Sequence, residues 1–249
     1  MKDTFIQHKV ISIPANSGVT SSQSILFKAD DCYDYLSGVA AFIVGGTLPS
    51  ADDIKFELRS DFESILSFSP AENWLKNTAS AAFNLQDVFK PLNVEARGRN
   101  FYFDYTVTNN AAFEIVVLLK QTKEQVKCIR YDEQSFDVPA PALGQGFEIT
   151  LPSDYTRVKG VMLSGGQAAN ALHLGFEIYD AGGQIVDPLP FAMLKPSVNT
   201  PYDAGFYPLD FESKSKQINV RLTALGTLPA TYVATNYTVT FLLIDESNV

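Results

Sequence analysis

The chain has 249 residues, 46% of them hydrophobic, and a formal net charge of −9. This length suits one large β domain or two small ones, and the hydrophobic content predicts a packed core rather than disorder. The acidic balance, without any run of Lys or Arg, excludes a surface dedicated to phosphate backbones, so we expect no specific nucleic acid binding. The two distant cysteines, Cys32 and Cys128, predict neither a disulfide framework nor a zinc site.

Residues 1–19 are interpreted as an N-terminal arm, because they precede the repeated part of the chain. They lack the uninterrupted apolar run of a secretory signal peptide, and no stretch of the chain approaches the roughly 18 apolar residues of a membrane span. The sequence therefore predicts a soluble protein made in the cytoplasm. The arm mixes Lys2, His8 and Lys9 with apolar residues, a composition suited to contact with neighbouring molecules or anionic lipid headgroups. A frayed terminus or an ordinary first strand is the alternative for this segment.

Residues 20–133 predict a first β-sandwich. The stretch "NFYFDYTVT", which begins at Asn100, places Phe101, Phe103, Tyr105 and Val107 on one face with a period of two, as in a half-buried strand. Ahead of the later strands, the sequence predicts a short helix with Ser69 as N-cap and Pro70 at the first helical position. Trp74 lies on the apolar face of this predicted helix.

Residues 134–146 are rich in Pro and Gly and are interpreted as a linker, and residues 147–249 as a second β-sandwich. A second short helix, of about two turns, is predicted with Asp187 as its cap and Pro196 at its end. The segment Gly226–Thr235, "GTLPATYVAT", is an insertion relative to the first sandwich. Otherwise the elements follow the same order in both halves.

Five short matches occur in the same order in the two halves, at offsets between 117 and 124 residues. They are "YDYLSGV" (Tyr33–Val39) with "YTRVKGV" (Tyr155–Val161), "FEL" (Phe56–Leu58) with "FEI" (Phe176–Ile178), "WLK" (Trp74–Lys76) with "MLK" (Met193–Lys195), "FKPLNVE" (Phe89–Glu95) with "FYPLDFE" (Phe206–Glu212), and "FEIVVLL" (Phe113–Leu119) with "YTVTFLL" (Tyr237–Leu243). The shared order indicates a duplication. With many short strands in each copy, the sequence predicts an all-β fold of two tandem eight-stranded jelly-roll sandwiches, each with one short helix.

Residues able to support catalysis or metal binding are sparse. His8 and His173 are the only histidines and do not recur in register, which excludes the multi-histidine metal sites of duplicated cupins and two-domain copper monooxygenases. Among the carboxylates, Glu57 and Glu177 recur in the FEL and FEI matches, and we interpret both as outward-facing strand residues. We therefore predict no catalytic residue, no cofactor, no metal ion and no enzymatic activity.

The combination of an N-terminal arm, two tandem jelly rolls, a helix in each and a Pro-rich joint resembles the double jelly-roll major capsid proteins of tailless icosahedral viruses, including membrane-containing bacteriophages and adenovirus. The resemblance spans about Ser22 to Asp245 and rests on architecture and duplication. It implies homotrimers whose six jelly rolls form a pseudo-hexagonal tile, and tiles that cover an internal membrane. It also implies contacts with neighbouring trimers and with penton or vertex proteins, in a virion built from protein made in the host cytoplasm.

Two other classes stay open on the sequence alone. A secreted two-domain carbohydrate-binding or adhesive sandwich would present an aromatic platform beside a ligand-binding loop, and Trp74, on a predicted helix, is not an obvious platform. A jelly-roll amidase or glycosidase would place carboxylates in a cleft, with Asp52, Asp53 and Glu57 as the residues to neutralise. Trimer formation, glycan binding and activity loss on neutralisation would distinguish the three.

Overall fold

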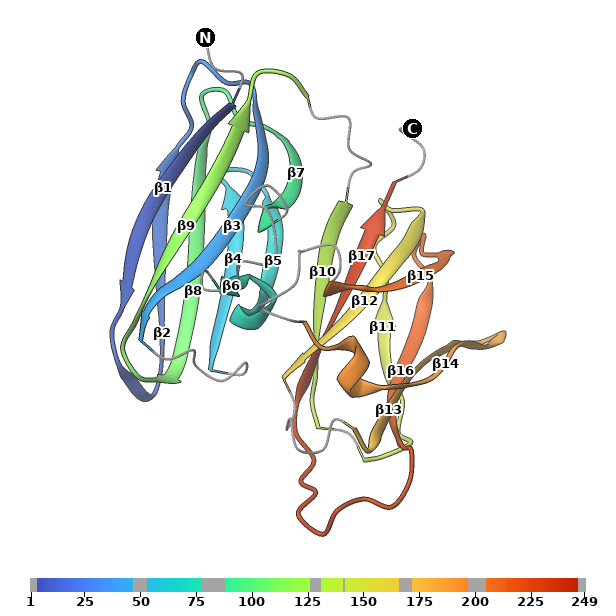
Figure 1. Ribbon diagram of the computed structural model, residues 1–249. Helices are drawn as coiled ribbons and strands as arrows, with labels where there is room; N and C mark the ends of the chain where they lie inside the picture. Colours follow the sequence, from blue (N-terminus) through green and yellow to red (C-terminus); the bar gives the residue numbers. More distant parts are fainter. Residues whose placement is uncertain are drawn as a thin grey trace. The chain divides into compact units, whose positions relative to one another are not determined.

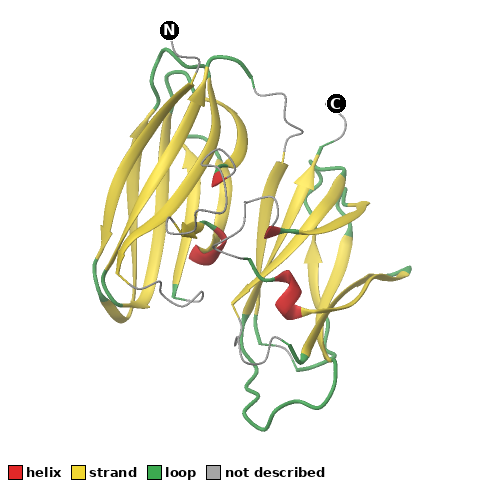
Figure 2. Ribbon diagram, in the orientation of Figure 1, coloured by secondary structure: helices red, strands yellow, loops and turns green. Residues whose placement is uncertain are grey.

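A computed structural model describes residues 4–46, 53–77, 88–125, 131–140, 142–165, 172–196 and 205–245. The chain divides into two compact units, the first ending at Asp132 and the second beginning at Glu133. Strands dominate both units, and the helical residues form short turns (Figure 2). Over the described ranges, no helix is long and apolar enough to cross a membrane.

Two sheets enclose the core of the first unit (Figure 1). The first sheet contains β1 (Thr4–Ile13), β9 (Phe113–Thr122) and β3 (Tyr35–Gly46) in that order, with β7 (Lys90–Glu95) and the short β6 (Leu75–Asn77) both paired to β3. The second sheet has the order β2 (Asn16–Lys28), β8 (Asn100–Asn110), β4 (Ile54–Ser60) and β5 (Ser64–Pro70). All pairings are antiparallel except that of β6 with β3.

The second unit repeats this arrangement. Its first sheet has the order β10 (Tyr131–Val138), β17 (Tyr237–Ile244), β12 (Arg157–Gly165) and β15 (Tyr207–Glu212). Its second sheet has the order β11 (Phe147–Thr150), β16 (Gln217–Ala224), β13 (Leu174–Asp180) and β14 (Gly183–Pro190). Within the described ranges, β10 to β17 thus occupy the places of β1 to β5 and β7 to β9, which confirms two tandem eight-stranded jelly rolls.

The first strand of the first unit lies in the segment interpreted as an arm, and that of the second unit runs from the end of the predicted first sandwich into the predicted linker. In the predicted N-terminal arm, β1 pairs along its whole length with β9, from Thr4 opposite Thr122 to Ile13 opposite Phe113. In the same way β10, which runs into the predicted linker, is the neighbour of β17. Of the alternatives for residues 1–19, β1 is an ordinary first strand, and β10 extends to Val138 within the segment interpreted as a linker. Both strands are edge strands of a sheet.

The matching heptapeptides FKPLNVE and FYPLDFE each begin with a Phe that packs over a glycine of the neighbouring strand. A Cβ atom added to Gly38 would lie 3.1 Å from Cβ of Phe89, and one added to Gly160 would lie 2.9 Å from Cβ of Phe206. The pairing register shifts just before each glycine. Only glycine permits so close an approach. The glycine and the phenylalanine therefore recur together as one packing unit in both halves.

The helix predicted from Ser69 is a single 3-10 turn in the described residues. Strand β5 continues to Pro70, and the turn η1 covers Ala71–Asn73 without a side-chain cap. Residues 78–87, where the rest of this prediction falls, lie outside the described residues. Pro70 has an extended conformation, with ψ of 143°, so it ends a strand rather than beginning a helix.

The helix predicted from Asp187 is likewise reduced to the 3-10 turn η4, Phe191–Leu194. Asp187 lies within β14 and caps nothing, because the turn is preceded by the extended residue Pro190, with ψ of 125°. The one short helix predicted for each copy is therefore a turn at the equivalent place in each unit (Figure 2).

Each unit has its own hydrophobic core, completed by an aromatic ring from the region of the 3-10 turn. In the first unit, Trp74 packs edge-on against Phe56 and Phe103, with ring centroids 6.2 and 5.7 Å away. In the second unit, Phe191 and Phe176 pack edge-on against Tyr237, at 6.0 and 6.5 Å. Edge-on packing places the positive ring edge against the negative ring face and stabilises both clusters.

Candidate interaction surfaces

Glu177, one of the two recurring acids, is held in a buried ion pair on β13. It is 3% exposed, and its carboxylate accepts hydrogen bonds from Nε and Nη2 of Arg221 at 2.7 and 3.1 Å. Nε2 of Gln184 donates a third, at 2.9 Å. The hydrogen bond to Glu177 raises the pKa of Arg221. All these donors belong to the sheet itself, so the carboxylate fixes neighbouring strands together rather than facing a substrate.

Glu57, at the equivalent position of the first unit, has different partners. It lies opposite Asp104 on β8 and accepts a hydrogen bond from Oγ of Ser64 at 2.7 Å. The nearby cation is Arg59, whose Nε lies 2.5 Å from Oδ2 of Asp104. The hydrogen bond to Asp104 raises the pKa of Arg59. The carboxylate of Glu57 is therefore one member of a polar network on the outer face of the sheet.

The other candidate residues do not converge on one place. Asp53 uses its backbone carbonyl to accept a hydrogen bond from the Thr108 amide at 2.9 Å, while His8 is exposed on β1 and Cys32 is exposed in a turn. His173 belongs to the second unit. Asp52 and Cys128 lie outside the described residues. In the described part of the chain, no group of three or more His, Cys, Asp or Glu side chains could hold a metal ion.

Trp74 is part of the core and not of a binding platform. Its side chain is 3% exposed, and the indole Nε1 donates a hydrogen bond to Oγ of Ser69 at 2.7 Å. Nζ of Lys90 lies 4.4 Å from the centre of the indole. A sugar-binding platform requires an exposed aromatic face, and the buried indole of Trp74 does not provide one.

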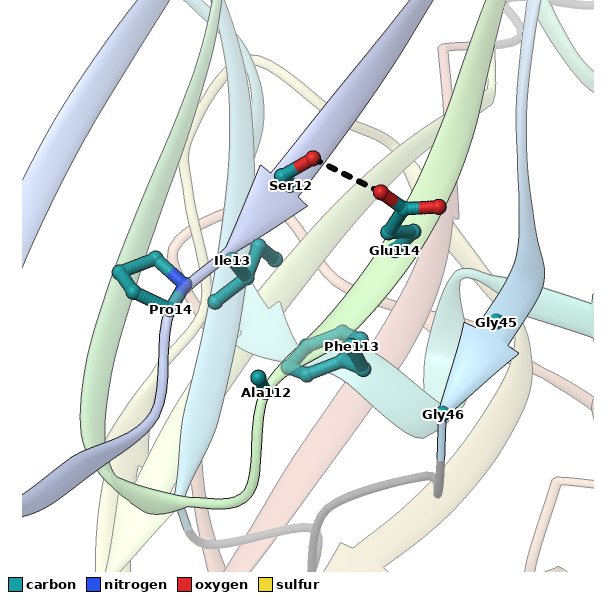
Figure 3. A pocket seen from close by; sticks show the side chains of 8 residues that line it. All are labelled: Ser12, Ile13, Pro14, Gly45, Gly46, Ala112, Phe113 and Glu114. Atoms are coloured by element: carbon teal, nitrogen blue, oxygen red, sulfur yellow. Dashed lines mark hydrogen bonds between the residues drawn. The ribbon is translucent and has the colours of Figure 1, made fainter.

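A depression opens at one end of the first unit, where β1, β3 and the start of β9 meet (Figure 3). Its lining combines apolar side chains and glycines with a single carboxylate: Ser12, Ile13, Pro14, Gly45, Gly46, Ala112, Phe113 and Glu114. Oγ of Ser12 donates a hydrogen bond to Oε1 of Glu114 at 3.0 Å. At the equivalent place in the second unit the hydroxyl is on the last strand and the carboxylate on the first. There, Oγ1 of Thr238 donates a hydrogen bond to Oδ1 of Asp137 at 2.8 Å. Both pairs connect the first and last strands of a unit.

The outer faces of these first and last strands differ in polarity. In the first unit Val10 lies opposite Val116, and Val10 is 61% exposed. In the second unit the hydroxyls of Ser135 and Thr240 are 2.9 Å apart and Thr240 is fully buried. Exposed apolar side chains on an edge strand are typical of interaction surfaces, so the first unit presents the stronger candidate.

The loop before the last strand also distinguishes the units. It has two residues in the first unit, between β8 and β9, and twelve in the second, between β16 and β17. This confirms the predicted insertion at Gly226–Thr235, visible as the long excursion between β16 and β17 in Figure 1. Leu228 and Tyr232 pack against the core of the second unit, whereas Val233 is 56% exposed.

Comparisons with known proteins show similarity in structure alone. No protein-family model matches the chain, and no curated protein matches its sequence. A chain from the atomic structure of Sulfolobus Turreted Icosahedral Virus is similar over 98% of this chain and 91% of its own length, with a TM-score of 0.50 and 10% identity. The major capsid protein P2 of Bacteriophage PM2 is similar over 96% of this chain and 97% of its own length, with a TM-score of 0.48 and 10% identity.

A glycosylasparaginase, PNGase F from Flavobacterium meningosepticum, is similar over 98% of this chain and 96% of its own, with a TM-score of 0.43 and 8% identity. At identities this low, structural similarity does not indicate a shared activity. The full-length match to the viral chain supports the duplicated jelly-roll architecture described above.

The sequence indicated contacts with neighbouring molecules for residues 1–19, but it did not predict that β1 forms an edge of the first sandwich. A repeat signal for this strand was present, since Ile13, Pro14 and Ala15 recur as Val138, Pro139 and Ala140 at an offset of 125. The last strands, β9 and β17, match at an offset of 124 residues, and they are the strands with which β1 and β10 pair. The two offsets are therefore nearly equal.

Proposed function

We propose that this chain is the structural capsid protein of an icosahedral virus. Three copies would form a homotrimer whose six jelly rolls make a pseudo-hexagonal tile, and such tiles would cover an internal membrane in the virion. The proposal includes a purely structural role without catalysis, synthesis in the host cytoplasm, and contacts with neighbouring trimers and with penton or vertex proteins.

The observation that carries the proposal is the completeness of the duplication. In the described residues, eight strands occupy equivalent places in two sheets of each unit, the first unit adding only the three-residue β6, and both units have a 3-10 turn after the fifth strand. A threefold assembly of such a chain contains six similar sandwiches, and a six-sided tile packs on a surface without gaps. A binding protein or enzyme with one site has no comparable need for two complete and equal copies. The similarity to a chain from an icosahedral virus supports the same conclusion.

The differences between the copies suit the two kinds of contact that such a tile needs. Contacts within a trimer and contacts between trimers involve different neighbours, so equivalent positions in the two units are free to diverge. The twelve-residue loop before β17 and the apolar outer face of β1 are the clearest divergences. We propose no lipid contact by an extended arm, because Thr4–Ile13 is paired in a sheet.

The proposal is tested by measuring the mass of the purified chain in solution and its ability to assemble. Light scattering coupled to size-exclusion chromatography should give about 82 kDa, three times the chain mass of 27.4 kDa. Electron microscopy of concentrated protein should show shells or sheets with hexagonal tiling, and addition of lipid vesicles should test the membrane component. A chain that stays monomeric at every concentration would overturn the proposal.

A further inference from the structure

Each sandwich has two lateral flanks, because each of its two sheets ends in an edge strand on either side. In the first unit, β1 and β2 form one flank, and β5 with β7 and β6 forms the other. In the second unit, the corresponding flanks are β10 with β11, and β14 with β15. Lys9 ties β1 to β2 directly, because its Nζ donates a hydrogen bond to the backbone carbonyl of Leu26 and lies over the ring of Phe27.

The inference rests on the proposed trimer. In a ring of six similar sandwiches, each sandwich meets one neighbour through one flank and the next neighbour through the other. Between chains, a first unit therefore meets a second unit either through its β1–β2 flank against β14–β15, or through its β5–β7 flank against β10–β11. The charges of the four flanks distinguish these pairings.

The β1–β2 flank is the acid-free part of an acidic chain. Residues 4–28 contain Lys9, Lys28 and His8 and no Asp or Glu. The flank also exposes three large apolar side chains, with Ile6 43%, Val10 61% and Leu26 45% exposed. Apolar side chains surrounded by charges of one sign are the composition expected of a protein contact with a partner of the opposite sign.

The β14–β15 flank of the second unit has the opposite character. The two strands contain Asp187, Asp210 and Glu212 and no Lys or Arg. Asp210 is already paired with Arg157 and Lys159 of the adjacent strand, at 2.6 and 2.9 Å.

Asp187 and Glu212 are exposed, and in the described part of the chain neither carboxylate has a side-chain hydrogen bond or an ion pair. Pro188 and Pro208 lack a backbone donor on this flank, so a neighbour would contact it through side chains rather than by adding a strand.

The alternative pairing has no such complementarity. The strands β5, β6 and β7 contain Lys76, Lys90 and Glu95, and Lys90 is buried at 3% exposure. Residues 131–150, which include β10 and β11, contain four acids and no Lys or Arg. A nearly balanced flank would there meet an acidic one. Because opposite charges favour association and like charges disfavour it, the first pairing is preferred.

We propose that the β1–β2 flank of one chain binds the β14–β15 flank of a second chain, and that Lys28 faces Glu212 across this contact. The two residues lie at the same end of a sandwich. Lys28 pairs with Asn100 at the start of β8, just after the turn that follows Glu95, and Glu95 is the equivalent of Glu212 in the first unit. In a ring with parallel sandwiches these ends stand at one level.

A charge-swap experiment tests the contact on the full chain. Lys28→Glu and Glu212→Lys should each raise the concentration at which the trimer dissociates by about tenfold at low ionic strength, because each removes an attraction and adds a repulsion at three equivalent contacts. The combined variant should return to within about threefold of the original chain. Mass photometry measures the trimer fraction, and thermal unfolding checks that each variant is folded.

Glu95→Lys is the matched control, because it makes the same change at the equivalent end of β7 and should not restore the trimer of Lys28→Glu. If Glu212→Lys restores the trimer of Lys28→Glu and Glu95→Lys does not, the contact is supported. If the original chain is a trimer and both single reversals leave its dissociation unchanged, the contact is overturned and the proposed function stands. If the original chain is a monomer, the proposed trimer fails and this contact fails with it.

Discussion

In the first unit the ring that completes the aromatic cluster comes from the residue after the 3-10 turn, and in the second it comes from the residue that begins the turn. Trp74 and Met193 are aligned in the WLK and MLK matches, yet Trp74 is 3% exposed and Met193 is 62% exposed. Phe191 fills the core of the second unit instead. Two copies with the same backbone order can therefore place an equivalent side chain in the core or in solvent, and sequence alignment of the halves does not predict which.

Substitution of the aligned pair should have the largest effect and the greatest asymmetry. Trp74→Ala should destabilise the first unit by about 3–5 kcal/mol, because it empties a large buried site. Met193→Ala should change stability by less than about 0.5 kcal/mol, because the side chain is in solvent. Calorimetric unfolding of the two variants measures both values. Similar losses in the two variants would contradict the different placement of these residues.

The recurring acids separate the units in the same way. Glu177→Gln should destabilise the second unit by about 2 kcal/mol, since it removes charge-assisted hydrogen bonds between a buried carboxylate and Arg221. Solvent reaches Arg221, which is 37% exposed, and this limits the loss. Glu57→Gln, the matched change in the first unit, should cost about 0.5 kcal/mol or less. Chemical denaturation measures the loss of stability in both variants. An equal loss at the two positions would show that burial of the carboxylate does not determine its contribution.

The aligned residues Phe113 and Tyr237 differ by one hydroxyl, and both are buried. In the described part of the chain, the Tyr237 hydroxyl has no hydrogen-bond partner, and burial raises the pKa of Tyr237 above its ordinary value. Tyr237→Phe should therefore stabilise the second unit at neutral pH by about 1–2 kcal/mol, because an unpaired buried hydroxyl is costly. Loss of stability in this variant at neutral pH would reveal a partner for the hydroxyl.

The same residue should make stability depend on alkaline pH. A raised folded-state pKa means that the unfolded chain loses this proton first, so the contribution is constant below about pH 10 and stability falls above it. Tyr237→Phe should have a shallower decline above pH 10 than the original chain. Unfolding followed as a function of pH, in both proteins, provides the comparison, and parallel declines would refute the assignment.

The smallest effect concerns the turn before β8 and β16. Gly98 has φ of 70°, and at the equivalent place Ser215 has φ of 58°, in the left-handed region that favours glycine. Ser215→Gly should stabilise the second unit by about 1 kcal/mol, and Gly98→Ala should destabilise the first by a similar amount. A Cβ atom at Gly98 would meet no atom within 4 Å, so backbone strain alone is measured. Thermal unfolding should show a higher melting temperature for Ser215→Gly and a lower one for Gly98→Ala. Shifts in the same direction would contradict the prediction.

Much of the fold was predictable because its signals are local. Alternation with a period of two identified the strands, and the FEL and FEI matches fall on β4 and β13 as equivalent strands. The starting residues and lengths of the two short helices were wrong because proline next to Ser69 or Asp187 has the same sequence pattern in a strand that ends as in a helix that begins. The first strands were not distinguished from an arm and a linker, because the three-residue match from Ile13 covers only the last residue of each strand.

The interaction surfaces were less predictable than the fold, because they depend on which strands become edges. That property follows from pairing between distant segments, such as β1 with β9 across more than a hundred residues. The lack of acids in residues 4–28 can be read from the sequence, but its meaning requires the knowledge that β1 and β2 share one flank of the sandwich.

The mass of the purified chain in solution tests the central claim most directly. Light scattering should give about 82 kDa, corresponding to three chains of 27.4 kDa that bring six jelly rolls together. A mass of 27.4 kDa at all concentrations would contradict the proposed capsid trimer.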